Sequence, residues 1–200
     1  MTTLDPPITT PQGAPVHPGL FLPEALNPER DAGLWVPQAP GVWFRPLLLC
    51  ASQGFYVNLL RVSEGGKMPR HRHAGAVHTF TLRGRWRYLE HDWEAIPGSY
   101  AFDPPGQTHT LVLADGVEEM LALFHVTGGY VYVDAHGHAE GYDDVFTKIE
   151  ATRRHYISLG RNADDVQVIE DVKSEITRKD KTYRLKAKIM AAMGLPVTEV

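Results

Sequence analysis

The chain has 200 residues, 43% of them hydrophobic and 22% charged, which suits one ordinary globular core with additional terminal segments. A formal net charge of −4 gives the whole molecule no attraction to nucleic acid or anionic lipid, so we expect neither partner. No stretch approaches the roughly 20 apolar residues of a membrane-spanning helix, and the first residues lack the pattern of a signal peptide. The single cysteine, Cys50, lies in an apolar run, which predicts a buried thiol in a cytoplasmic protein that acts on small molecules.

Residues 1–40 are predicted to form a proline-rich N-terminal arm. Ten of the fifteen prolines fall between Pro6 and Pro46, and each proline fixes φ and removes a hydrogen-bond donor. We expect this arm to lie extended across the body of the protein or across a partner subunit. A homodimer or homotetramer is the expected assembly.

Residues 41–140 are predicted to form an all-β domain. Short apolar runs alternate with turn residues, as in GFYVNLLRV, AVHTFTLRG, GSYAFDPPG and EEMLALFHV, and this texture is typical of a sandwich, jelly roll or barrel. Gly84 separates FTLRG from RWRYLEH, and we expect these two runs to pair as a hairpin.

Residues 141–200 are predicted to be helical. Asp143 or Asp144 can cap a first helix that ends at Gly160 and packs on the barrel. Its apolar face is expected to comprise Val145, Phe146, Ile149, Tyr156 and Ile157. A final helical tail carries seven basic and two acidic residues between Lys173 and Lys188. We interpret it as a solvated helix face, and we rank a docking element for nucleic acid or a partner below that.

Two histidines one residue apart are the first chemical signal. Side chains alternate along a strand, so His71 and His73 project to the same side of the sheet. His136 and His138 have the same spacing, but they lie among turn residues, and we interpret that second pair as part of a loop.

A third histidine follows in GSYAFDPPGQTHTLVL. Gly98 suits the turn into a strand, and Pro104 with Pro105 ends that strand. Gly106 then permits the tight turn that directs His109 inward. We therefore expect His109 to join the first two imidazoles.

These residues carry a resemblance to the cupins. The spacing G-x5-H-x-H ending at His73, and G-x5-P-x-G-x2-H ending at His109, resembles the two cupin motifs. The resemblance implies a double-stranded β-helix, or jelly-roll barrel, that holds a metal ion through His71, His73 and His109. The chain departs from the motifs where many cupins have a glutamate and an asparagine, because here His78 and Leu113 stand at those positions.

From about Trp35 to Ile169 the chain also resembles 2,4'-dihydroxyacetophenone dioxygenases and, more distantly, acetylacetone-cleaving dioxygenases. This resemblance implies an Fe(II) enzyme, with Zn, Mn or Ni as substitutes, that uses O2 to cleave the bond beside a ketone. The substrate would be an aryl hydroxyketone or diketone, and 2,4'-dihydroxyacetophenone would give 4-hydroxybenzoate and formate. Three neutral imidazoles suit such an ion and leave positions open for reactants. A metal-binding sensor without turnover, and a Zn or Mn isomerase or hydrolase, are the alternatives.

Two further residues are candidates for catalysis. His78 is expected to face the interior together with Phe80 and Leu82, where it would support a ligand or line the pocket; a fourth ligand and a plain core histidine rank below. Glu90 is a carboxylate that can orient a ligand or take the substrate proton, and its alternative is a surface charge. Five aromatic residues can line the pocket or form core, the latter being more common: Phe80, Trp86, Tyr88, Phe102 and Phe124.

Overall fold

A computed structural model describes residues 20–166, 168 and 169. The predicted arm up to residue 19 and the basic tail from residue 170 lie outside these described residues. The chain divides into two units, with the boundary between Arg30 and Asp31. Within the first unit, residues 20–30 contain turns, and the guanidinium of Arg30 donates to the carbonyl of Pro23.

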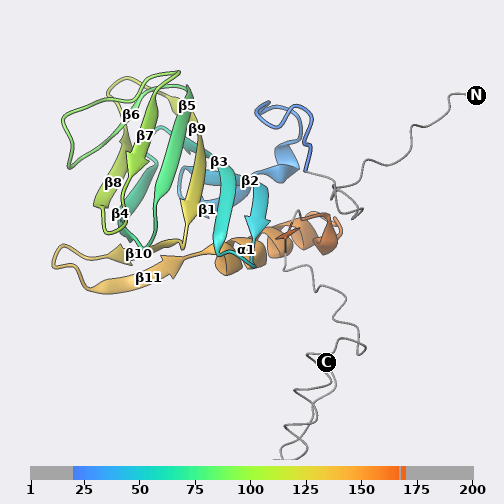
Figure 1. The fold of residues 1–200 in the computed structure, drawn as a ribbon. Helices are drawn as coiled ribbons and strands as arrows, with labels where there is room; N and C mark the ends of the chain where they lie inside the picture. The colour runs from blue at the N-terminus through green and yellow to red at the C-terminus, as the bar shows by residue number, and fades with distance from the viewer. Residues whose placement is uncertain (1–19, 167, 170–200) are drawn as a thin grey trace, which may run out of the picture. The chain divides into compact units, whose positions relative to one another are not determined.

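The second unit is built from two β-sheets (Figure 1). The seven-stranded sheet has the order β1-β2-β3-β9-β5-β7, and β12 pairs with β2. Its strands are β1 (Val36–Ala39), β2 (Val42–Cys50), β3 (Phe55–Ser63), β5 (Val77–Arg83), β7 (Tyr100–Asp103), β9 (Glu119–Thr127) and β12 (Val168–Ile169). β1 belongs to this sheet although it lies within the stretch predicted as an extended arm.

The five-stranded sheet has the order β11-β10-β4-β8-β6. Its strands are β4 (Lys67–His73), β6 (Trp86–Tyr88), β8 (Thr108–Leu113), β10 (Tyr130–Val133) and β11 (Ala139–Asp143). The pairings within it are antiparallel. The predicted all-β jelly-roll fold is confirmed.

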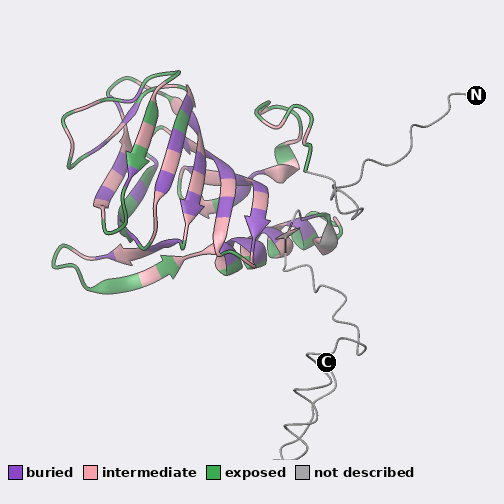
Figure 2. Ribbon diagram, viewed as in Figure 1, coloured by how far each residue is buried: buried purple, intermediate pink, exposed green. Residues whose placement is uncertain are grey.

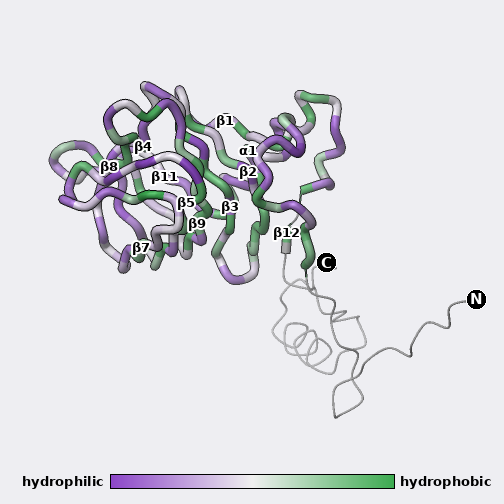
Figure 3. The backbone as a smooth tube through the Cα atoms, turned by 90° about the horizontal axis from the view of Figure 1, so that it is seen from above, coloured by the Kyte–Doolittle hydropathy of each residue, from purple (hydrophilic) through white to green (hydrophobic). Residues whose placement is uncertain are grey.

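The core lies between the sheets because side chains alternate along each strand. Figure 2 shows buried residues recurring along the strands, and Figure 3 shows the hydrophobic character of β3, whose sequence is FYVNLLRVS. The largest fully buried side chains include Trp86, Tyr56, Tyr88 and Phe44. Cys50 is buried and free, as its apolar surroundings predict.

The predicted hairpin around Gly84 is wrong. β5 pairs with β9 and β7 in one sheet, whereas β6 pairs with β8 in the other, so the chain crosses between sheets at this glycine. Gly84 has φ +73°, and a Cβ there would lie 2.2 Å from the carbonyl oxygen of Glu119. Gly84 does form a turn, but this turn carries the chain from one sheet to the other.

The helix α1 (Val145–Ser158) begins at the predicted cap. The carboxylate of Asp144 accepts from the backbone N–H of Thr147 at 2.9 Å, and the Thr147 side chain bonds back to the Asp144 N–H. The helix packs against β1, β2 and β11 (Figure 1). The predicted face is only partly right, since Phe146 and Ile157 are more than 60% exposed. The buried face comprises Val145, Lys148, Ile149, Thr152 and Tyr156.

Two short 3₁₀ helices, η1 (Ala32–Leu34) and η2 (Ala163–Asp165), complete the described elements. The guanidinium of Arg161 donates to both carboxylate oxygens of Asp31 at 2.7 Å, which ties the chain after α1 to the start of η1. None of the helices in the described part of the chain is long and apolar enough to cross a membrane.

The contrast between two glycines tests the crossover. Gly84→Ala should lower the free energy of unfolding by about 3 kcal/mol or more, since it combines a left-handed backbone with a clash against backbone atoms. Gly54→Ala should cost only about 1 to 2 kcal/mol, because Gly54 also has positive φ but a Cβ there meets nothing within 4 Å. Chemical denaturation measures both values, and equal losses would contradict the close approach at Gly84.

Candidate metal centre

Strand pairing brings the three predicted histidines together. His71 and His73 lie on β4, and His109 lies on β8, directly opposite His71 in the antiparallel register. All three are buried, and His109 has no exposed surface. The Nε2 atom of His73 lies 3.2 Å from that of His71 and 3.0 Å from that of His109. The three Nε2 atoms therefore point toward a common position between the rings.

A local irregularity sets the orientation of the β4 pair. The register between β4 and β8 shifts between Met68 and His71, and Pro69 lies within this shift. Proline lacks an N–H, so it is tolerated where the ladder is interrupted. The Pro69 carbonyl oxygen accepts a hydrogen bond from the Nδ1 atom of His71 at 2.7 Å, which leaves the Nε2 atom of that ring as the nitrogen with a free lone pair.

Burial keeps these imidazoles neutral. Desolvation, together with the smaller effect of the neighbouring histidines, lowers the pKa of His73 to about 3 and that of His109 to about 2. Desolvation also lowers the pKa of His71, although the hydrogen bond with Pro69 acts in the opposite direction. Neutral rings present lone pairs, and lone pairs are what a cation binds.

The donor set fits a first-row divalent ion. The three histidines each offer one nitrogen, and these atoms lie within 4.8 Å of one another. One proton can serve only one of the close nitrogen contacts, whereas a divalent cation can accept a lone pair from each ring. In addition, the Nδ1 atoms of His73 and His109 are buried without a hydrogen-bond partner among the described residues. This centre can hold a metal through His71, His73 and His109.

Aromatic packing orients two of the rings. Tyr88 stacks on His109 with ring centroids 3.5 Å apart and an interplanar angle of 8°. The Tyr88 hydroxyl donates to the carboxylate of Asp103 at 2.8 Å, which fixes the tyrosine in turn. On the other side, the Tyr130 ring lies 4.8 Å from the ring of His71.

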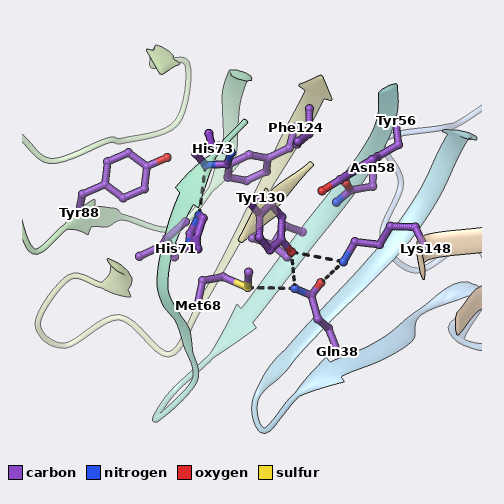
Figure 4. A pocket seen from close by; sticks show the side chains of 13 residues that line it. Gln38, Tyr56, Asn58, Met68, His71, His73, Tyr88, Phe124, Tyr130 and Lys148 are labelled. Carbon is purple, nitrogen blue, oxygen red and sulfur yellow. Dashed lines mark hydrogen bonds between the residues drawn. The ribbon is translucent and has the colours of Figure 1, made fainter. Parts of the chain in front are cut away.

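A cavity opens beside the histidines between the two sheets (Figure 4). The space between its walls, including the part open to solvent, is about 400 Å³. Most of its lining is apolar or aromatic, and this histidine cavity is bounded by Gln38, Tyr56, Asn58, Leu60, Met68, His71, His73, Tyr88, Leu111, Phe124, Val126, Tyr130 and Lys148. A mostly apolar cavity with few polar groups is typical of a small-molecule site.

Comparison with known proteins identifies the family. Residues 28–131 match the ChrR cupin-like domain. The chain belongs to this cupin family. A sequence comparison with curated proteins gave no match.

Solved cupin structures share the fold. An RmlC-like cupin protein from Ralstonia eutropha JMP134 is 28% identical, with a TM-score of 0.63, over 68% of this chain and 89% of that one. A cupin-like protein from the same organism is 24% identical, with a TM-score of 0.57, over 60% and 75% of the two chains. An acetylacetone dioxygenase from Acinetobacter johnsonii is 15% identical, with a TM-score of 0.57, over 78% and 99%. At such identities the last two show the fold alone.

His78 faces away from the cavity of this cupin. On β5 the buried positions are Val77, Thr79 and Thr81, whereas His78 lies on the opposite face with Phe80, which is 49% exposed. The Nδ1 atom of His78 lies 2.7 Å from the hydroxyl of Tyr100, at the outer surface. The expectation of an inward His78 is wrong: it followed the glutamate position of other cupins, whereas the buried positions of β5 continue the odd-numbered series of His71 and His73.

Glu90 follows β6 and lies at the surface. Its carboxylate accepts from the backbone N–H of Thr110 at 2.8 Å and from the hydroxyl of Thr110 at 3.1 Å. Glu90 is not among the described residues that line the cavity. Its negative charge acts to raise the pKa of His71, against the larger lowering by desolvation. The catalytic role of Glu90 stays a prediction.

The other sequence predictions have mixed outcomes. His136 and His138 lie in the loop between β10 and β11, as expected, and the Nδ1 atom of His138 pairs with the carboxylate of Asp134 at 3.0 Å. Of the five aromatic candidates, Tyr88 and Phe124 line the cavity, Trp86 is core, and Phe80 and Phe102 are exposed.

Sequence reasoning missed the polar end of the cavity. Lys148 on α1 donates to the Gln38 side-chain oxygen at 2.8 Å and lies 3.4 Å from a carboxylate oxygen of Asp143. The hydroxyls of Tyr130 and Tyr132 donate to the same carboxylate oxygen. The helical period was an available signal, because Lys148 falls on the face of Val145 and Ile149.

Lys148 is buried and its partner Asp143 is partly buried. Desolvation lowers the pKa of Lys148, and the nearby carboxylate offsets part of this effect. Desolvation raises the pKa of Asp143, but Lys148 and the hydroxyl donors outweigh it, so the pKa lies below its ordinary value. The Asp143 carboxylate therefore remains ionised at neutral pH, and its charge favours the protonated form of Lys148.

The histidine pairs supply a matched test of metal binding. His73→Ala and His109→Ala should each weaken the binding of a divalent ion by more than about tenfold, because each removes one of three donors. His138→Ala removes a histidine of the same H-x-H spacing in a loop and should leave binding unchanged. Metal analysis and calorimetric titration with Co(II) measure this, with circular dichroism to check folding. Equal affinity in all four proteins would contradict the assignment.

Proposed function

We propose that this cupin is a metal-dependent dioxygenase that cleaves the carbon–carbon bond beside the ketone of an aryl hydroxyketone. With 2,4'-dihydroxyacetophenone and one O2, the products are 4-hydroxybenzoate and formate. The observation that carries the proposal is the convergence of three neutral Nε2 atoms, at 3.0 and 3.2 Å, beside a mostly apolar cavity that His71 and His73 line. The likeness to an acetylacetone dioxygenase supports the fold that such chemistry uses, and makes a β-diketone the alternative substrate.

The proposed ligands are His71, His73 and His109, and the proposed metal is Fe(II), with Zn, Mn or Ni as ions that can replace it. When bound, Fe(II) would supply Lewis acidity and the electrons that O2 activation needs. Because all three ligands are neutral, the centre attracts an anionic, oxygen-rich ligand such as a deprotonated hydroxyketone.

The rest of the chain positions the substrate and limits water. Leu60, Leu111, Phe124 and Val126 give the cavity apolar walls, which suit an aromatic ring. Tyr130 and Tyr88 hold the histidine rings in place by contact and stacking. An apolar environment also strengthens the electrostatic attraction between the centre and an anionic oxygen.

A second candidate function is a metal-binding cupin that binds a small ligand without turnover. The observation that favours it is the centre itself, because three histidines beside a mostly apolar cavity can hold an ion and a small ligand whether or not a reaction follows. Oxygen consumption separates the two functions, since a binding protein would saturate with ligand and leave O2 unchanged.

Oxygen uptake tests the proposed reaction. Protein loaded anaerobically with Fe(II) should consume one O2 for each 2,4'-dihydroxyacetophenone and release one formate. His109→Ala should lose more than about tenfold of this activity, because it removes a donor from the centre, and His138→Ala should retain it. Absence of O2 uptake with this substrate and with simple diketones would reject the proposal, and product formation without O2 would indicate an isomerase or hydrolase.

A further inference from the structure

The histidine cavity has a second polar region, which the three ligands do not explain. Figure 4 shows Asn58 and Lys148 on one side of Tyr130 and the histidines on the other. Asn58 lies on β3, and Lys148 reaches the cavity from α1. Both side chains are almost fully buried, at 4% and 2% exposure.

The Asn58 amide faces the cavity. It makes no hydrogen bond with the other side chains drawn in Figure 4, and its oxygen and nitrogen are not among the described atoms that are wholly enclosed without a partner. Burying an amide without a hydrogen bond is unfavourable, and an apolar residue would fill the same strand position better. An amide retained in a cavity wall points to a ligand that pairs with it.

Two of the three hydrogen bonds of Lys148 are long. Its ammonium donates to Gln38 at 2.8 Å and to Tyr130 and Asp143 at 3.4 Å each, so a ligand oxygen can replace one of the two long bonds. Asp143 is better satisfied, since Tyr132 and Thr147 donate to it at 2.8 and 2.9 Å. The ammonium lies 4.3 Å from the centroid of the Phe44 ring, so aromatic carbon surrounds much of its charge.

A purely structural role does not need this arrangement. Replacing a buried ion pair with well-packed apolar residues is often neutral or stabilising. The buried face of α1 already supplies Val145, Ile149 and Tyr156 for packing on the barrel. A lysine at the cavity wall, beside an amide that faces the cavity, is better explained by recognition of a ligand.

We propose that Lys148 and Asn58 bind an anionic oxygen of the substrate at the end opposite the histidines. The ligand class is a compact apolar molecule with a metal-binding oxygen at one end and a phenolate or carboxylate oxygen at the other. Lys148 supplies a charge-assisted hydrogen bond, and the Asn58 amide supplies a second donor. That the other end of the ligand binds a metal at the histidines rests on the proposed function. Binding of the far oxygen by Lys148 and Asn58 does not require turnover.

Three probes that differ at one ring position test this inference. Calorimetric titration of the protein as purified would use 4'-hydroxyacetophenone, 4-acetylbenzoate and acetophenone. The wild type should bind at least one of the two oxygen-bearing probes about tenfold more tightly than acetophenone, as expected for a charge-assisted hydrogen bond. The better probe shows whether the site takes a phenolate or a carboxylate. Bound phenolate would also move the near-ultraviolet absorption of 4'-hydroxyacetophenone to longer wavelength.

Two cavity variants and one control locate the effect. Lys148→Met and Asn58→Leu should each bring the ratio of the affinities for the preferred oxygen-bearing probe and for acetophenone close to one. Each should change the affinity for acetophenone itself by less than about threefold. Asn58→Leu should be at least as stable to heat as the wild type, because the amide it removes makes no hydrogen bond with the other cavity side chains. Arg154→Met, an exposed position on the same helix, should change neither preference nor stability.

Two results would overturn the inference. One is a wild type that shows no preference for, or no binding of, either oxygen-bearing probe. The other is a loss of affinity in Asn58→Leu that is equal for all three probes, since that would indicate altered packing. These outcomes leave the oxygen-uptake test unaffected, so failure of this inference and failure of the proposed function are distinguishable.

Discussion

The structure depends on one constraint. Three imidazole nitrogens face one another in a buried space and do not have enough protons to satisfy their contacts. Such an arrangement is unfavourable by itself, because lone pairs repel and two Nδ1 atoms lack partners. The sheet imposes it through the register that sets His71 opposite His109, the shift at Pro69, and the stacking of Tyr88. A strained polar cluster held by rigid strands is typical of a site built for an ion.

The helix outside the barrel is connected to this centre through its cap. The Asp144 carboxylate fixes the first turn of α1, and Thr147 donates to Asp143 at 2.9 Å. Together these contacts set the rotation of the helix, which places Lys148 one residue further on against Gln38 and Tyr130. The Tyr130 ring then contacts His71. A capping box at the end of β11 therefore determines where a charge enters the cavity.

The sequence predicted those parts of the site that follow from strand periodicity. Alternation places His71 and His73 on one face, and the turn residues before His109 bring it to the neighbouring strand. His78 was misplaced because its expected direction came from the glutamate position of other cupins, whereas alternation continued from His71 and His73 puts Val77 and Thr79 inward. The Gly84 hairpin failed because a turn residue does not reveal which sheet receives the next strand. Lys148 escaped notice because its partner Gln38 is distant in sequence, and Asn58 because nothing in the strand FYVNLLRVS shows that it faces a cavity.

The charge balance of the cavity determines which ligands it can bind. The three proposed ligands carry no charge, and the Asp143 carboxylate is already matched by Lys148 and its hydroxyl donors. A divalent ion in this centre would therefore receive no compensating negative charge from the described cavity lining, where carboxylates are absent. In an environment of low dielectric, uncompensated charge is costly. The negative charge has to arrive with the ligand, so the histidine end of the cavity selects for an anionic oxygen, and a neutral molecule of the same shape would leave the charge of the ion uncompensated.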